Sequence, residues 1–169
     1  MRRAGVATAL ALIASPAVAE VASVDDRGFV IERRVTLTTT PAATWTRLIR
    51  PARWWSNTHS WSGRAANMTI EPRIGGCFCE RWKGGEAEHG RVIQAVPGRL
   101  LRLSAPLGPL QSMGVSAVLS FELVPVGNAT EVRLRYIVGG NFGMDPRALA
   151  PAVDNVLREQ LAGLAKRAN

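Results

Sequence analysis

The chain has 169 residues, and Lys and Arg outnumber Asp and Glu by 21 to 13, which gives a formal charge of +8. This length suits one domain with a hydrophobic core and is short for two. The basic residues are scattered, without a lysine run, a basic helix face or an alternation with aromatic residues. We therefore expect a solvated basic surface and no binding of nucleic acid.

The first 19 residues have the layout of a secretory signal peptide. Arg2 and Arg3 supply a positive start, residues 4–13 are small and apolar, and residues 17–19 read Ala-Val-Ala. The apolar stretch is shorter than the roughly 20 residues that a membrane-spanning helix needs. We expect cleavage after Ala19, a periplasmic or secreted location and no transmembrane anchor in the mature chain. An ordinary first helix of a cytosolic domain is the alternative.

The mature chain is expected to begin with a short leader, followed by a strand and a helix. Residues 20–28 are polar and are expected to form a flexible leader. Residues 30–40 are rich in β-branched side chains with apolar residues at alternate positions, which predicts a strand. Thr40 followed by Pro41 is typical of a helix start, and apolar residues then recur at helical spacing.

Glycine and proline pairs divide the middle of the chain into short strands. After a polar and aromatic loop, we place strands near residues 68–72, 77–82, 86–96, 100–104, 115–125 and 130–138. Residues 153–164 carry one apolar stripe at helical spacing, which predicts a long C-terminal helix. Residues 29–169 are therefore expected to form one α+β domain. In it, a curved antiparallel sheet of about six to seven strands wraps around the C-terminal helix and leaves a hollow between them.

Several segments resemble the START-like (SRPBCC) helix-grip superfamily, most of all its polyketide cyclase branch and the homologues of the heat-shock-protein ATPase activator. They are residues 38–45, residues 51–55, and residues 71–80 with their Gly-Gly turn. The similarity spans about residues 29–168. It implies the fold but not the activity, because this superfamily contains carriers, enzymes and regulators. The export signal departs from a mostly cytosolic branch and argues against a chaperone-ATPase role.

Aromatic residues and a histidine gather in the loop that follows the first helix. Trp54, Trp55 and Trp61 lie within eight positions, with His59 among them. These tryptophans can grip an apolar or ring-bearing ligand, with His59 as a polar anchor. Alternatively, they plug the open end of the sheet and His59 is solvated. Further residues expected to line the hollow are Phe78, Glu80, Met113 and Tyr136.

Cys77 and Cys79 stand two apart in a predicted strand, so both thiols point to the same side. Three interpretations stay open. The cysteines are small buried apolar groups, or a disulfide that suits an oxidising compartment, or ligands of a soft metal together with His89 or His59. A disulfide would have to bridge about 6.6 Å between Cα atoms. The metal site would have only three ligands, which makes it the weakest interpretation.

Glu80 and His89 lie on neighbouring strands of a predicted hairpin and can act as an acid–base pair inside an apolar cavity. His59 is the other candidate for the base. Adjacent strand residues point opposite ways, so only one of Glu88 and His89 can share a face with Glu80. The alternative role of Glu80 is a salt bridge to a nearby arginine such as Arg91 or Arg102.

The sequence contains no nucleophile elbow, phosphate-binding glycine loop or dinucleotide fingerprint, so no cofactor is expected. The apolar run of residues 105–114 is either a lid over the cavity or a packed connection between strands. We interpret the chain as an exported protein that binds a hydrophobic small molecule between the sheet and the C-terminal helix. A cofactor-independent cyclase- or hydrolase-type enzyme is the first alternative, and a metal-binding protein centred on the two cysteines is the second.

Overall fold

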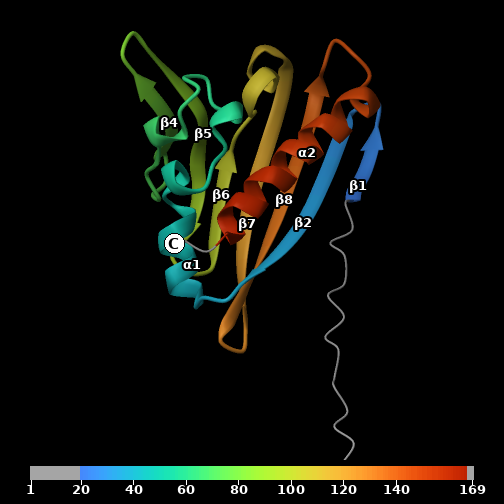
Figure 1. Ribbon diagram of the computed structural model, residues 1–169. Helices are drawn as coiled ribbons and strands as arrows, with labels where there is room; N and C mark the ends of the chain where they lie inside the picture. Colours follow the sequence, from blue (N-terminus) through green and yellow to red (C-terminus); the bar gives the residue numbers. More distant parts are fainter. Residues whose placement is uncertain (1–19, 167–169) are drawn as a thin grey trace, which may run out of the picture.

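The computed structural model describes residues 20–166, in which a long helix crosses one face of a curved antiparallel sheet (Figure 1). Eight strands follow the order β1-β2-β8-β7-β6-β5-β4-β3 across the sheet. They are β1 (Glu20–Asp25), β2 (Gly28–Leu37), β3 (Met68–Ile70), β4 (Cys77–Trp82), β5 (Gly85–Val96), β6 (Leu100–Ser104), β7 (Gly114–Val126) and β8 (Ala129–Asn141). The predicted signal peptide, residues 1–19, lies outside the described range.

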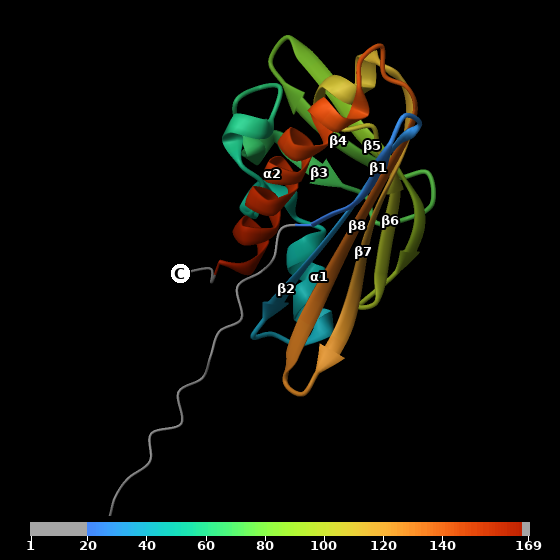
Figure 2. The same ribbon diagram turned by 90° about the vertical axis from the view of Figure 1, so that its right-hand side faces the viewer.

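Both α-helices lie on the concave side of the sheet, as the side view in Figure 2 shows. The helices are α1 (Pro41–Leu48) and α2 (Pro146–Ala165), with the short 3₁₀ helices η1 (Pro51–Arg53), η2 (Asn57–His59), η3 (Ala65–Asn67) and η4 (Gly108–Ser112). The predicted α+β class, with a sheet wrapped around the C-terminal helix, is confirmed. Within residues 20–166, no helix is both long and apolar enough to cross a membrane.

The two α-helices begin where cap residues precede a proline. Thr40 accepts a hydrogen bond from the backbone of Ala43, and Asp145 accepts one from the backbone of Arg147. Each cap satisfies a backbone N–H group that the first helical turn leaves without a partner. The buried stripe of α2 then packs on the sheet and contains Ala150, Asp154, Leu157, Leu161 and Leu164.

Alternate residues of β2 face α2, and one of them is an arginine. Phe29, Ile31 and Leu37 are buried as the period-two pattern predicts, and Arg33 is buried on the same face. The Arg33 Nε donates to Oδ1 of Asp154 at 2.6 Å, and its Nη2 donates to Oδ2. Because both charges are withdrawn from water, each depends on the other for neutralisation. The pair therefore ties the middle of α2 to β2.

Residues 20–28 do not form the flexible leader that their polar composition predicted. Most of this segment is β1, an edge strand that pairs antiparallel with β2. An edge strand with one solvated face does not need an apolar sequence, so composition alone was misleading. The turn between the strands closes at Gly28, where φ is 155° and a Cβ atom would lie 1.9 Å from the carbonyl oxygen of Val138. With β1 the sheet has eight strands instead of the expected six or seven.

We predict that Arg33→Met lowers the free energy of unfolding by about 3–5 kcal/mol, because it leaves the Asp154 carboxylate buried without a partner. The double variant Arg33→Met/Asp154→Leu is expected to recover most of this loss, because both buried charges are removed together. Urea denaturation followed by circular dichroism measures both effects.

The control is Arg135→Met, which breaks the exposed pair between Arg135 and Glu32 and is expected to cost less than about 1 kcal/mol. A double variant no more stable than Arg33→Met alone would contradict the assigned role of the pair.

Candidate functional site

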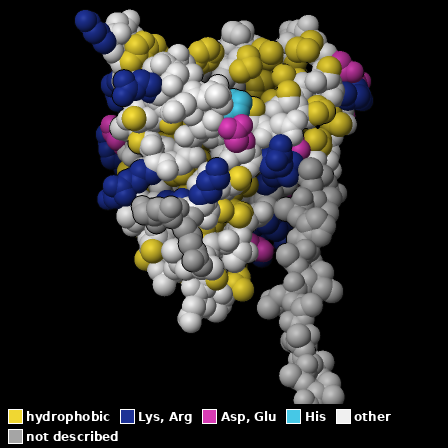
Figure 3. Space-filling model, in the orientation of Figure 1, with side chains coloured by type: hydrophobic (Ala, Val, Ile, Leu, Met, Phe, Trp, Pro, Cys, Tyr) yellow, Lys and Arg dark blue, Asp and Glu magenta, His cyan; other side chains and the backbone are white. Residues whose placement is uncertain are grey.

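A cavity of about 280 Å³ lies between α2, η4 and the loop that contains η2. Most of its surface is apolar, and its polar side chains are concentrated on the η2 side. Its lining residues are Trp55, Thr58, His59, Ser60, Trp61, His89, Leu107, Gly108, Pro109, Leu110, Leu149, Ala152, Val153, Val156 and Leu157. Figure 3 shows hydrophobic side chains gathered beside a histidine and a carboxylate on this face. The molecule therefore has a hollow suited to an apolar guest.

A buried carboxylate–imidazole pair forms one wall of this cavity. The Oε2 of Glu80 lies 3.0 Å from Nε2 of His89. The same carboxylate accepts backbone hydrogen bonds from Trp61 at 2.9 Å and Ser62 at 2.7 Å. Glu80 is fully buried, and His89 is only 3% exposed but lines the cavity. The cavity surface thus carries the imidazole, and the carboxylate stands behind it.

His89 lies on the same face as Glu80, because Glu80 pairs with Ala87 and strand alternation returns to that face at His89. The register between β4 and β5 shifts at Cys79, which pairs with Glu88, so that His89 is the extra residue. A bulge interrupts the strict alternation of side chains, so Gly90, which follows His89 directly, is buried as well. The neighbouring Gly90 allows a close approach, since a Cβ atom there would lie 2.7 Å from the backbone oxygen of Ser104. Of the two candidates on β5, the structure therefore turns His89 toward Glu80.

Burial and hydrogen bonding set the protonation of this pair. Burial works to raise the pKa of Glu80, but hydrogen bonds from Ser62, Trp61 and His89 outweigh it and leave that pKa below its ordinary value. Burial lowers the pKa of His89, although Glu80 opposes this shift. At neutral pH the pair is therefore a carboxylate and a neutral imidazole, so Nε2–H of His89 donates to Glu80.

The second ring nitrogen of His89, Nδ1, is left as a hydrogen-bond acceptor. With the proton held on Nε2, Nδ1 carries a free lone pair. Within residues 20–166, Nδ1 has no hydrogen-bond partner, and no fully buried side-chain nitrogen or oxygen lacks one. Nδ1 is therefore not fully buried. Because His89 lines the cavity, we infer that Nδ1 is accessible from the cavity. The site offers one proton acceptor in apolar surroundings.

His59 lies at the rim and pairs with a helix residue. Its Nε2 is 2.9 Å from Oε2 of Glu159 in α2, and both side chains are partly exposed. The indole N–H of Trp55 donates to the His59 carbonyl oxygen at 2.8 Å, which fixes the η2 loop against α2. Trp61 also lines the cavity and is 51% exposed. Trp54 instead packs under α1, where its indole N–H donates to a backbone carbonyl.

The remaining predicted lining residues form the layer behind the cavity surface. The ring of Phe78 lies between Trp55 and His89, with centroid distances of 5.4 Å and 4.9 Å. Tyr136 donates to the carbonyl of Ala105 at 2.8 Å, and burial raises its pKa. Met113 follows η4 and packs on the core without lining the cavity.

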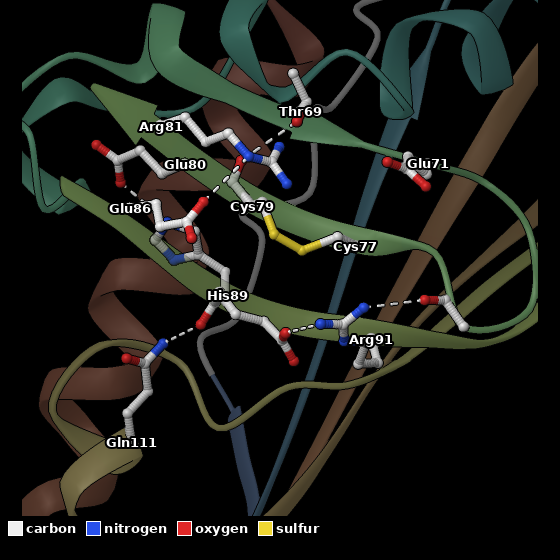
Figure 4. The surroundings of a disulfide bond; sticks show 12 residues. Thr69, Glu71, Cys77, Cys79, Glu80, Arg81, Glu86, His89, Arg91 and Gln111 are labelled. Atoms are coloured by element: carbon white, nitrogen blue, oxygen red, sulfur yellow. Dashed lines mark hydrogen bonds and ion pairs between the residues drawn. A yellow bond between two sulfur atoms is a disulfide. The ribbon is translucent and has the colours of Figure 1, made fainter. Parts of the chain in front are cut away.

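Cys77 and Cys79 form a disulfide, with their Cα atoms 5.3 Å apart. This spacing is shorter than the roughly 6.6 Å of a regular strand. Figure 4 shows the disulfide on β4 and Arg91 on the neighbouring strand. The carboxylate of Glu88 pairs with Arg91. The two sulfurs and a Glu88 oxygen lie within 4.8 Å of one another, but bonded sulfurs are not thiolate ligands.

Two expectations about these residues are therefore wrong. His89 does not join the cysteines in a metal site, because its side chain lies on the opposite face, where it bonds to Glu80. Glu80 does not pair with Arg91, which binds Glu88, or with Arg102, which bonds to Ser120 and Gln94. Glu80 is instead hydrogen-bonded to His89.

Several residues of the cavity wall were not predicted from the sequence. Residues 107–110 form one side of the cavity, so the apolar run after β6 is a packed wall anchored by Tyr136. On α2, Leu149 and Ala152 extend the lining by one turn before the predicted stripe. Their spacing from Val153 and Val156 follows the helical period and was the available signal.

Known proteins resemble this chain in fold. No protein-family model matches the sequence, and no curated protein is a match. Protein MLL2253 from Mesorhizobium loti is 17% identical, with a TM-score of 0.58 over 80% of this chain and 93% of that one. CalU16 from Micromonospora echinospora is 18% identical, with a TM-score of 0.53 over 81% and 72% of the two chains. The Aha1 dimer from Colwellia psychrerythraea is 21% identical, with a TM-score of 0.53 over 80% and 92%. These likenesses show a helix-grip fold.

We predict that acidification destabilises the protein through the buried pair. Because the pKa of His89 is lowered by folding, the unfolded chain takes up a proton below the ordinary value of 6.5 that the folded chain does not. The free energy of unfolding should then fall by up to about 1.4 kcal/mol per pH unit. The lowered pKa of Glu80 adds a further loss below its ordinary value of 4.5. Denaturant titrations at successive pH values measure the slope.

In His89→Gln the part of the slope that begins below 6.5 should disappear, while Glu80 keeps an amide donor. His59→Gln is the matched control, since it removes the only other histidine and should leave the buried pair intact. An equal slope in His89→Gln and the parent protein would contradict the assignment of a neutral buried imidazole.

Proposed function

We propose that this chain is an exported START-like (SRPBCC) protein that binds a small, largely apolar molecule between the sheet and α2. The cavity carries this proposal, because its walls are apolar and its buried wall presents one hydrogen-bond acceptor, His89 Nδ1. Transfer of apolar surface from water contributes roughly 25 cal/mol per Å². A ligand that buries on the order of 200 Å² would gain about 5 kcal/mol before the entropy cost of association.

Export is supported by two independent features. The first 19 residues have the order of a secretory signal, with a cleavage sequence that ends at Ala19. The Cys77–Cys79 disulfide suits a compartment that keeps thiols oxidised. In this proposal the mature protein begins at Glu20, the first residue of β1.

We predict that the full chain, produced in a bacterial host and recovered from its periplasm, has the mass of residues 20–169. This mature chain should bind the neutral apolar fluorophore N-phenyl-1-naphthylamine with increased emission. Val153→Trp fills the cavity and should weaken this binding at least about tenfold, because the apolar space is lost. Fluorescence titration measures the change.

Ala148→Trp is the matched control, since it adds the same indole to an exposed site on α2 away from the cavity. A mass that retains residues 1–19 would contradict export, and equal fluorophore binding by the two tryptophan variants would contradict the cavity as the binding site.

The Glu80–His89 pair favours a second candidate function, a cofactor-independent enzyme that works by general base catalysis. The neutral imidazole presents Nδ1 to the cavity, while the carboxylate behind it can stabilise the imidazolium that forms when a proton is taken up. His59 is a less suitable base, since it stands at the partly exposed rim and is paired with Glu159.

For this second candidate we predict exchange of the C–H protons next to the carbonyl of 1-indanone in heavy water. His89 Nδ1 would take the proton and leave an enolate, and the exchanged imidazolium would return a deuteron to the same carbon. Proton transfer by a positioned base contributes about 100-fold or more in rate. Proton NMR follows the loss of the C–H signal.

His89→Gln should abolish this acceleration, and Glu80→Gln should reduce it because an amide stabilises the imidazolium less than a carboxylate does. His59→Gln should exchange at the parent rate. Exchange no faster than in buffer, or unchanged in His89→Gln, would rule against the enzyme and leave the binding function intact.

A further inference from the structure

A second hollow lies at the other end of α2, and we call it the basic groove. It has a volume of about 690 Å³ and is bounded by α1, η1 and the last turns of α2. Its charged lining side chains are Arg47, Arg50, Arg53, Lys166 and a single acid, Glu159. Figure 3 shows Lys and Arg side chains on the face where α1 meets the end of α2. This groove has the charge of a site for an anion.

Two of the arginines are available for a ligand. Arg47 donates to the carbonyl oxygens of Gly163 and Lys166, so it serves the end of α2. Within residues 20–166, the guanidinium groups of Arg50 and Arg53 make no hydrogen bond or ion pair, and both residues are exposed. A guanidinium presents a planar fork of donors that matches carboxylate and phosphate oxygens.

The basic groove and the cavity are neighbours. Trp55 lines both hollows. His59 lines the cavity, Glu159 lines the groove, and the hydrogen bond between their side chains forms the partition. The α2 residues that line the cavity fall within 149–157, and those that line the groove fall within 159–166. The centres of the two sets are roughly 14 Å apart along the helix axis.

We propose that the ligand is an anionic amphiphile whose apolar chain occupies the cavity and whose carboxylate or phosphate head lies in the basic groove, between Arg50 and Arg53. The inference rests on the proposed binding function and adds the chemical class of the ligand. The side chains of the partition, His59 and Glu159, are 30% and 50% exposed, so they can move aside for the chain. Neither hollow alone accounts for both an apolar cavity and the exposed arginines next to it.

The test compares ligands that share one chain and differ in the head. Decanoate and decyl phosphate are the anionic probes, decan-1-ol is the neutral probe, and inorganic phosphate and acetate supply the head alone. Isothermal titration calorimetry of the mature chain at low salt should give both anionic probes a Kd roughly tenfold or more below that of decan-1-ol. Added salt should shrink this difference, because the cations are exposed.

The double variant Arg50→Gln/Arg53→Gln should bring the Kd values of the anionic probes close to that of decan-1-ol without changing the latter. The matched control is Arg34→Gln/Lys83→Gln, which removes the same charge from exposed positions outside both hollows. The control should keep the tenfold preference. A larger loss for decanoate or for decyl phosphate in the Arg50→Gln/Arg53→Gln variant would show which head the groove prefers and would support the inference.

Three results would overturn the inference, and the last of them would also overturn the proposed binding function. Equal Kd values for decan-1-ol and the anionic probes would show that the groove takes no part. Inorganic phosphate or acetate binding as tightly as the long-chain anions would show a site for small anions that is independent of the cavity. If none of the decyl probes binds, the cavity function itself fails together with the inference.

Discussion

Asp154 places a carboxylate on the buried face of α2, and the guanidinium of Arg33 on β2 neutralises it. A charge withdrawn from water costs several kcal/mol unless it is paired, so α2 cannot slide or rotate on the sheet without exposing both partners to that cost. The helix is therefore held near its middle. Around this point α2 faces η4 and the cavity, and toward its C-terminal end it faces α1 and the basic groove. The geometry of both hollows depends on this one contact.

The Glu80–His89 pair helps to form the wall of the cavity, and the apolar surroundings keep His89 neutral. Glu80 keeps its charge because two backbone N–H groups of the η2–β3 loop and His89 donate to it. The same interactions hold that loop over the sheet and position Trp61 at the rim. The imidazole remains neutral because its surroundings are apolar. A polar network thus builds the wall of an apolar site and leaves one lone pair facing inward.

Much of the fold could be predicted from local pattern, and the exceptions have physical causes. The alternation in β2, the Thr40-Pro41 helix start and the stripe of α2 gave the right elements because backbone period and side-chain burial agree there. The Arg33–Asp154 pair could not be predicted, because Arg33 taken by itself interrupts the apolar face of β2. Its partner lies 121 positions away in the sequence.

Side-chain placement at the site was harder to predict than the elements. Strand alternation correctly required a choice between Glu88 and His89, but the register that decides it depends on how β4 and β5 pair. Trp55, His59 and Trp61 border the cavity, whereas Phe78, Glu80 and Tyr136 stand behind it, because curvature of the sheet sets depth and sequence spacing does not.

The disulfide between Cys77 and Cys79 joins residues only two positions apart. A cross-link of this span removes little freedom from the unfolded chain, since the entropy that a disulfide withholds grows with the length of the loop it closes. Its influence is therefore confined to its neighbourhood, the ladder step that carries the bulge and, on the opposite face, His89. The chain can thus gain or lose this bond without a large change in global stability, and any effect of thiol oxidation would be felt first at the wall of the cavity.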